Sequence, residues 1–313
     1  MLENFVYSLN ATMPVFLVMV VGYFLKQIHW VDQNFVTVAN KINFKLTLPA
    51  LLLQDLANSK ITEVFDAKFV LYCAIITSIC FWSVWGLAKL FLKDDYMRGA
   101  FVQASFRGSV AVLGIAMVTN IYGDSGVMPL VLIGAVPLYN IYSVIVLTFE
   151  SNEEGGKTIK DAIKGILTNP IIIAIFAGMI LSILDLDYPV ILTSTVGSFA
   201  KMATPLALLA MGAGFEGAKA LTKVKPTIVA SCIKLIIQPV LFLPVAILLG
   251  FRGASLVAIL IMLGSPTTPS CYIMAKNMGN DGTLTSSIVV MTTVLSAFSI
   301  TGILFVLKSF GLV

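Results

Sequence analysis

The chain has 313 residues, of which 58% are hydrophobic and only 12% are charged. Water-soluble domains carry about a quarter charged residues, so this composition excludes a soluble globular protein. The four cysteines form no C-x-x-C pair and His29 is the only histidine, so we expect no structural zinc site, haem, disulfide framework or other cofactor. We therefore expect an integral membrane protein surrounded by lipid, with no nucleic-acid partner.

Ten stretches are apolar and long enough to cross a bilayer, since a helical span needs about 20 mostly apolar residues. A polar linker, 151–166, separates a first half (1–150) from a second half (167–313). This pattern predicts an all-α polytopic membrane protein. The predicted spans are 7–28, 34–56, 68–92, 98–121, 126–149, 167–185, 189–214, 224–249, 253–277 and 283–308.

The two halves repeat one another at a constant offset of 156 residues. Chance supplies one or two such matches, but several at one offset over most of a half indicate a duplication. Because each half has five spans, the second copy enters the membrane the other way up, which predicts a 5+5 inverted repeat. The matching pairs are Pro14 and Pro170, Gly22 and Gly178, Lys45 and Lys201, Pro49 and Pro205, and Gly108-Ser109 and Gly264-Ser265.

Lysine and arginine concentrate in the connections after the odd-numbered spans. Cytoplasmic loops carry the excess of these residues, so this side is predicted to be cytoplasmic and both termini to face outward. Trp30, Trp82 and Trp85 are expected at the membrane interface or facing lipid.

The ninth span is interrupted by Pro266 and Pro269, which remove two backbone donors and prevent a straight helix. Non-helical backbone at membrane depth is tolerated only where protein or a water-filled cavity surrounds it. The segment is therefore either a kink satisfied by neighbouring helices or a broken helix at a binding site. We favour the binding site, because hydroxyl groups surround the prolines: Ser265, Thr267, Thr268 and Ser270.

The matching segment of the fourth span contains Arg107, Gly108 and Ser109. A charge at membrane depth is costly and usually faces a cavity or a partner. No Asp or Glu is expected at mid-depth of any span, so Arg107 either faces an anionic ligand or has a structural or gating role satisfied by carbonyls. Asn140 in the fifth span is equally a ligand contact or an interhelical hydrogen bond.

Lys234 and Gln238 lie four residues apart in the eighth span and therefore share one face of a helix. Inverted repeats with interrupted helices are typical of secondary transporters, which bind their substrates where the two breaks meet. The helix ends at such breaks carry partial positive charge, and together with a guanidinium they favour an anion.

Three segments together resemble the auxin efflux carrier family: Ala104–Gly108 with Gly114 after it, Val136–Asn140, and Gly264–Pro266. The resemblance covers essentially the whole chain. It implies a fold like that of bile-acid sodium symporters, with spans 1, 2, 6 and 7 as a scaffold and spans 3–5 and 8–10 as a moving transport domain. It also implies that spans 4 and 9 cross in an X and that the protein is a homodimer.

The short linker fits the prokaryotic type of this family, which places the protein in a bacterial cytoplasmic membrane. Bacterial members are often described as malonate or other dicarboxylate transporters. The chain departs from the family at Gly108, where many members have asparagine, and at Ala116, near where a proline is common. The resemblance therefore implies a less pronounced first break.

The function that we predict is secondary transport of a small organic anion, a carboxylate such as malonate, malate or an auxin-like acid, by alternating access. The alternatives are a sodium-coupled symporter of larger amphipathic acids and a non-transporting membrane sensor. An enzyme is not expected, because no His/Asp/Glu constellation or nucleotide loop is present. The coupling ion, H⁺ or Na⁺, stays open.

Overall fold

The computed structural model describes residues 14, 17–58, 66–110, 118, 122, 127–151, 163–165, 167–184, 189–215 and 221–313. The start of the first predicted span, most of the linker 151–166, Gly114 and Ala116 lie outside these residues. Every regular element within the described part is a helix. The all-α prediction is therefore confirmed for the described part of the chain.

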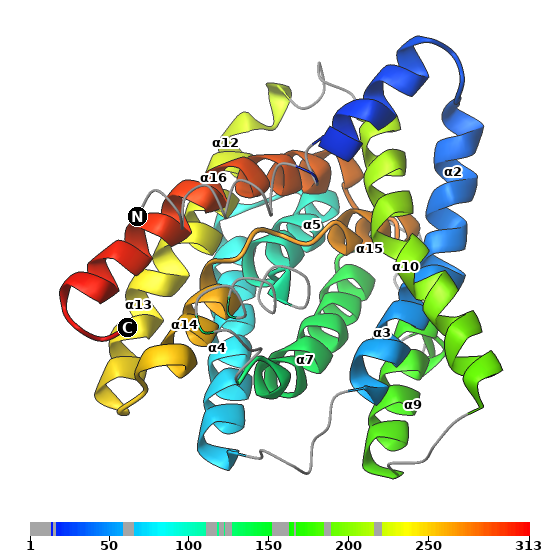
Figure 1. Cartoon of the computed structure of the whole chain (residues 1–313). Coiled ribbons are helices and arrows are strands. Elements are labelled where there is room, and N and C mark those ends of the chain that lie inside the picture. Colours follow the sequence, from blue (N-terminus) through cyan, green and yellow to red (C-terminus); the bar gives the residue numbers. More distant parts are fainter. Residues whose placement is uncertain are drawn as a thin grey trace.

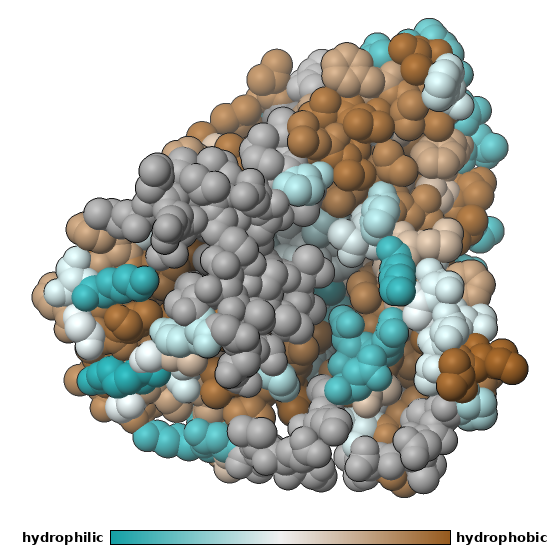
Figure 2. All heavy atoms as spheres, viewed as in Figure 1, coloured by the Kyte–Doolittle hydropathy of each residue, from teal (hydrophilic) through white to brown (hydrophobic). Residues whose placement is uncertain are grey.

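Within the described residues, five helices are long and apolar enough to cross a membrane, and three further apolar helices are shorter. The long ones are Ala67–Phe91, Met128–Phe149, Val190–Ala213, Val224–Leu248 and Gly282–Ser309, and the shorter ones Leu17–Gln27, Pro170–Ser182 and Gly253–Gly264. Large apolar side chains, such as Trp82 at 56% and Phe91 at 78%, stay exposed on these helices. Figure 2 shows hydrophobic residues over wide areas of the surface, as expected for a multi-pass membrane protein.

The helices pack in two groups, which Figure 1 shows side by side. In one group, α2 (Gln33–Ile42), the π-helix η1 (Asn43–Thr47) and α3 (Leu48–Ala57) contact α9 (Pro170–Leu184) and α10 (Val190–Ala213). The contacts between the two groups are much sparser than those within them.

The second group contains the remaining helices. It consists of α4 (Ala67–Phe91), α5 (Asp95–Phe106), α7 (Met128–Phe149), α12 (Val224–Cys232), η3 (Ile233–Ile237), α13 (Gln238–Leu248), α14 (Gly253–Gly264), α15 (Ser270–Asn277) and α16 (Gly282–Ser309). α15 lies where the groups meet, since it contacts α2, η1 and α10 as well as α5, α7 and α16.

Gly22, on the helix Leu17–Gln27, and Gly178, on α9, allow close helix contacts with the first group. A Cβ at Gly22 would lie 2.4 Å from the carbonyl oxygen of Leu209 on α10, and one at Gly178 would lie 3.0 Å from that of Leu53 on α3. Small residues permit such close approach of backbones in membranes. These two positions are a pair of the 156-residue repeat, so both copies use the same residue for the same kind of contact.

Both π-helices end two residues before a proline. Pro49 follows η1 and Pro239 follows η3. Proline has no N–H to donate and its ring crowds the preceding turn, so the wider π turn accommodates it without a sharp kink. The eighth predicted span therefore continues as one rod through α12, η3 and α13.

Trp85 is buried and does not face lipid, whereas Trp30 and Trp82 are exposed as expected. Trp85 is 8% exposed and its indole N–H donates to Glu150 Oε1 over 2.6 Å. Arg98 donates to the other carboxylate oxygen of Glu150, also over 2.6 Å. The acid attracts both side chains to the interior, and the cluster joins α4, α5 and the end of α7.

Candidate functional site

The two interrupted helices contact each other directly at their breaks. α5 ends at Phe106 and α14 ends at Gly264. The backbone N–H of Ser109 donates to the carbonyl oxygen of Pro266 over 2.9 Å, and the Thr267 hydroxyl donates to the carbonyl oxygen of Ala104 over 2.7 Å. The first break is therefore a true helix end, although it contains no proline.

The carbonyl groups at the two helix ends are satisfied by side chains of other helices. Gln238 donates to the carbonyl oxygen of Ser105 over 2.9 Å, at the end of α5. Tyr139 donates to that of Met262 over 3.0 Å, and Lys234 donates to those of both Met262 and Leu263, at the end of α14. Such groups have no partner within their own helix, and in hydrocarbon each would cost several kcal/mol if left alone. The shared face of Lys234 and Gln238 thus caps both broken helices.

Arg107 is the first residue after α5 and is only 4% exposed. One guanidinium nitrogen, Nη2, donates to the Ser270 hydroxyl over 2.8 Å. The other, Nη1, contacts the sulfur of Met274 at 2.9 Å and the Ser143 hydroxyl at 3.5 Å, and both of these contacts are weak. Arg107 forms no ion pair with an acid among the described residues. Its charge is therefore buried without a counter-ion.

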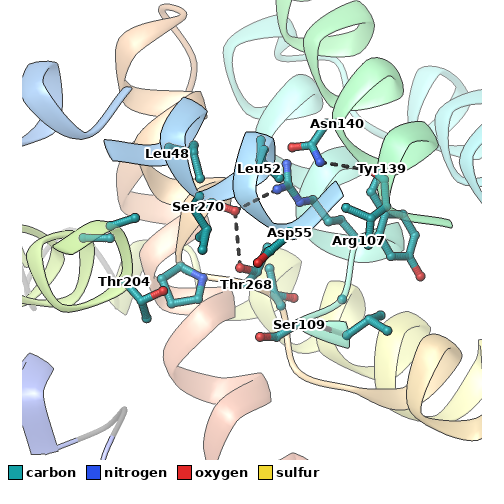
Figure 3. A pocket seen from close by; sticks show the side chains of 18 of the residues that line it. Leu48, Leu52, Asp55, Arg107, Ser109, Tyr139, Asn140, Thr204, Thr268 and Ser270 are labelled. Atoms are coloured by element: carbon teal, nitrogen blue, oxygen red, sulfur yellow. Dashed lines mark hydrogen bonds between the residues drawn. The ribbon is translucent and has the colours of Figure 1, made fainter. Parts of the chain in front are cut away.

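A cavity of about 110 Å³ lies at this crossing, between the two helix groups. Figure 3 shows Arg107 and Ser270 at its wall, joined by their hydrogen bond. Of the residues predicted for the site, the cavity is lined by Arg107, Gly108, Ser109, Asn140, Pro266, Thr267, Thr268, Pro269 and Ser270. Ser265 is the exception: it is fully buried and does not line the cavity.

The opposite wall comes from the first helix group and from α16. It consists of Asn43, Leu48, Leu51, Leu52, Asp55, Ala203, Thr204, Ala207 and Thr293. Leucine and alanine make up the apolar part of this wall, and Asn43, Asp55, Thr204 and Thr293 add polar groups to those at the breaks. A few polar groups in an otherwise apolar concave site are typical of small-molecule binding.

Asn140 binds within its own helix rather than across to another one. Its side-chain nitrogen donates to the carbonyl oxygen of Val136 over 2.9 Å, and its side-chain oxygen is buried without a partner. Of the two alternatives predicted for Asn140, a ligand contact or an interhelical hydrogen bond, the hydrogen bond is therefore not formed. The side-chain oxygen of Asn140 is thus a buried acceptor without a partner, in a residue that lines the cavity.

Asp55, which was not predicted for the site, also lines the cavity. It belongs to α3 and lies at the same cavity as Arg107, as Figure 3 shows. The two side chains form no ion pair, so the cavity is lined by one cationic and one acidic side chain that are not bonded to each other. The residue lies at the very end of predicted span 34–56, where an acid normally faces water. Its position in the sequence therefore gave no indication that it lines the cavity.

The start of α15, at the second break, has fewer free backbone N–H groups than predicted. The backbone N–H groups of Cys271 and Tyr272, in the first turn of α15, already donate to the carbonyl oxygens of Thr268 and Pro269. Side chains supply further donors at the cavity wall: the guanidinium of Arg107 and the hydroxyls of Thr268 and Ser270.

Comparison with known proteins identifies the family. The sequence profile of the membrane transport protein family matches residues 7–304. The chain belongs to this family. The resemblance to auxin efflux carriers is thereby confirmed, and this membrane transport protein is a multi-pass protein of a transporter family.

Its relatives are described as transporters as well. A "putative malonate transporter" of Rhizobium meliloti is 26% identical over 84% of both chains. An "uncharacterized transporter" of Methanothermobacter thermautotrophicus is 21% identical over 95% of this chain and 97% of its own length. The uncharacterized transporter YfdV of Escherichia coli K12 is 24% identical over 64% of this chain and 66% of its own.

Proposed function

We propose that this membrane transport protein is a secondary active transporter of a small carboxylate and binds it at the crossing of the two broken helices. The observation that carries the proposal is the buried guanidinium of Arg107, which lines the cavity and forms no ion pair with an acid among the described residues. Charges at membrane depth mark substrate pathways because the protein must otherwise compensate their desolvation. A carboxylate supplies the missing negative charge and matches the geometry of the guanidinium.

The size and the charge of the cavity limit which substrates it can bind. Its volume of about 110 Å³ is far below the roughly 300–1,000 Å³ of sites that bind drug-sized ligands. Malonate, malate and a similarly small organic acid fit this size better than larger amphipathic acids do. The Thr268 and Ser270 hydroxyls and the vacant oxygen of Asn140 provide further polar contacts.

Asp55 adds a requirement on the substrate. Since it faces the cavity together with Arg107, a fully ionised dicarboxylate meets one attractive and one repulsive group. A monoanion, or a dicarboxylate that carries one proton, is repelled less because it carries one negative charge instead of two. H⁺ is therefore the coupling ion that the cavity favours.

The packing in two groups supports transport by alternating access. We propose that α2, η1, α3, α9 and α10, with the helix Leu17–Gln27, form the scaffold. The helices from α4 to α7 and from α12 to α16 then form the transport domain. The cavity lies between the two groups, so a movement of one against the other would open it to alternate sides.

We further propose ten spans in a 5+5 inverted repeat, residues 1–150 and 167–313, joined by the linker 151–166. The equivalent contacts of Gly22 and Gly178 support this arrangement. A homodimer formed through the scaffold, a bacterial cytoplasmic membrane and outward-facing termini complete the proposal. A non-transporting sensor on the same fold is the alternative, and a transport assay separates the two.

The test is uptake of labelled mono- and dicarboxylates into proteoliposomes. We expect Arg107→Ala to lower the uptake rate by about 100-fold or more, because loss of one charged contact in a buried site costs about 3 kcal/mol. Arg252→Ala is the matched control: this arginine precedes α14 and donates only to the carbonyl oxygens of Ile247 and Phe251. Unchanged uptake in a folded Arg107→Ala variant would remove Arg107 from the site, and absence of uptake of every acid by the wild type would favour the sensor.

A further inference from the structure

A second buried cation lies beside the crossing, outside the cavity. Lys234 of η3 is 0% exposed and does not line the cavity. Its ammonium group donates to the carbonyl oxygens of Leu263 over 2.7 Å and Met262 over 3.1 Å. It forms no ion pair with an acid in the part of the chain that the structure describes. The partners of this ammonium are therefore neutral oxygens.

A third oxygen adjoins the same space beside Gly108 as the ammonium. The Ser265 hydroxyl is fully buried and has no hydrogen-bond partner. A Cβ built on Gly108 would lie 2.3 Å from this hydroxyl and 3.0 Å from the Lys234 nitrogen. Both groups therefore adjoin the space beside Gly108, which only glycine leaves open. The arrangement explains why Ser265 does not face the substrate cavity.

Neutral oxygens at the end of a broken helix are the chemistry that binds Na⁺ in transporters. The C-terminal end of a helix carries partial negative charge, and unwound carbonyls together with such ends coordinate the coupling ion. At the end of α14, two such carbonyl oxygens bind an ammonium that is part of the chain. Burying that charge is tolerable only because these oxygens replace its hydration shell.

We infer that Lys234 is a tethered cation that occupies the position of a coupling Na⁺ at the end of α14, so that transport needs no Na⁺ at the crossing. The inference rests on the proposed function, since it names the ion requirement of that same transporter. The inference also gives Lys234 a different role from that of Gln238. Gln238 caps the end of α5 through a neutral amide, so its loss leaves an unpaired carbonyl but removes no charge.

The experiment compares Lys234→Ala with Gln238→Ala, a control on the same helix face that also loses a donor to a carbonyl at a break. Melting temperature in detergent is measured in NaCl and in choline chloride of equal ionic strength. We expect the wild type and Gln238→Ala to respond equally to both salts. Lys234→Ala opens space for an ion among three oxygens, so Na⁺ should raise its melting temperature by about 3 °C or more relative to choline.

Uptake into proteoliposomes provides the second measurement. Wild-type uptake should be the same in both salts, whereas uptake by Lys234→Ala should be roughly threefold or more faster with Na⁺, because the ion restores the binding-competent state. A folded Lys234→Ala that ignores Na⁺ in both assays would overturn the inference. Na⁺-stimulated uptake by the wild type would overturn it too, and this holds even if the variant fails to fold.

The two proposals fail separately in these assays. If the wild type takes up no carboxylate, the proposed function is wrong, while the melting temperatures of Lys234→Ala still test the cation position. If the wild type takes up carboxylate in a Na⁺-dependent manner, the proposed function stands and the inference about Lys234 is wrong.

Discussion

The two breaks at the crossing differ in how the chain leaves the helix. At the end of α14, Pro266 and Pro269 prevent the helix from continuing, and Lys234 donates hydrogen bonds to the carbonyl oxygens that are left without partners. At the end of α5 no proline is present, and neutral donors from Gln238 and Thr267 hold the carbonyls. One break is thus imposed by its own sequence, and the other depends on its surroundings. The comparison shows that a helix inside this protein can end without a proline where donors from neighbouring segments bind its carbonyl groups.

The largest effect is expected from removing the local cause of the second break. In Pro266→Ala/Pro269→Ala the segment regains two N–H donors and can continue as a helix, which would pull Thr267 away from the carbonyl oxygen of Ala104. We expect saturable uptake to stop while the protein still inserts and elutes as a single species. Normal turnover by this variant would show that the prolines have no part in the mechanism.

A smaller effect is expected at the two glycines that the repeat makes equivalent, Gly108 and Gly264. A Cβ at Gly108 would lie 2.3 Å from the Ser265 hydroxyl, whereas one at Gly264 would come no closer than 3.2 Å, to Pro239. Gly108→Ala should therefore cost about 3 kcal/mol of stability through overpacking, and Gly264→Ala about 1 kcal/mol or less. Denaturation in mild detergent compares the two variants. Equal losses would mean that the two breaks are packed alike.

The smallest effect concerns two neighbouring hydroxyls at the second break. Thr267→Val removes the donor to the carbonyl oxygen of Ala104 and leaves this group unpaired, which should cost about 1 kcal/mol. Ser265→Ala removes a hydroxyl that has no partner, so its effect on the melting temperature should be close to zero. A larger loss from Ser265→Ala than from Thr267→Val would contradict the hydrogen bonding described for the crossing.

Local sequence signals predicted the helices and the residues at the crossing well. Hydropathy predicts α4 (Ala67–Phe91) and α7 (Met128–Phe149) to within two residues, because a lipid-facing helix must be apolar throughout. The prolines at 266 and 269 mark the second break, and the repeat transfers that position to Gly108. These signals depend only on residues near in sequence.

The contacts that the sequence did not reveal all join distant segments. Lys234 reaches carbonyls of α14, Trp85 reaches Glu150, and Asp55 faces Arg107 across the cavity. Each depends on how one helix is rotated against another, which the composition of a single span does not encode. A polar residue in an apolar helix signals that a partner exists without saying which one.

The hydrogen bond from Ser109 to Pro266 limits how the protein can move. This bond and the one from Thr267 to Ala104 join the two breaks directly, so we expect them to move as one unit in the proposed transporter. The cavity would then open where these breaks meet α3 and α10. A bound acid would travel together with the breaks and would not be released between two parting halves of its binding site.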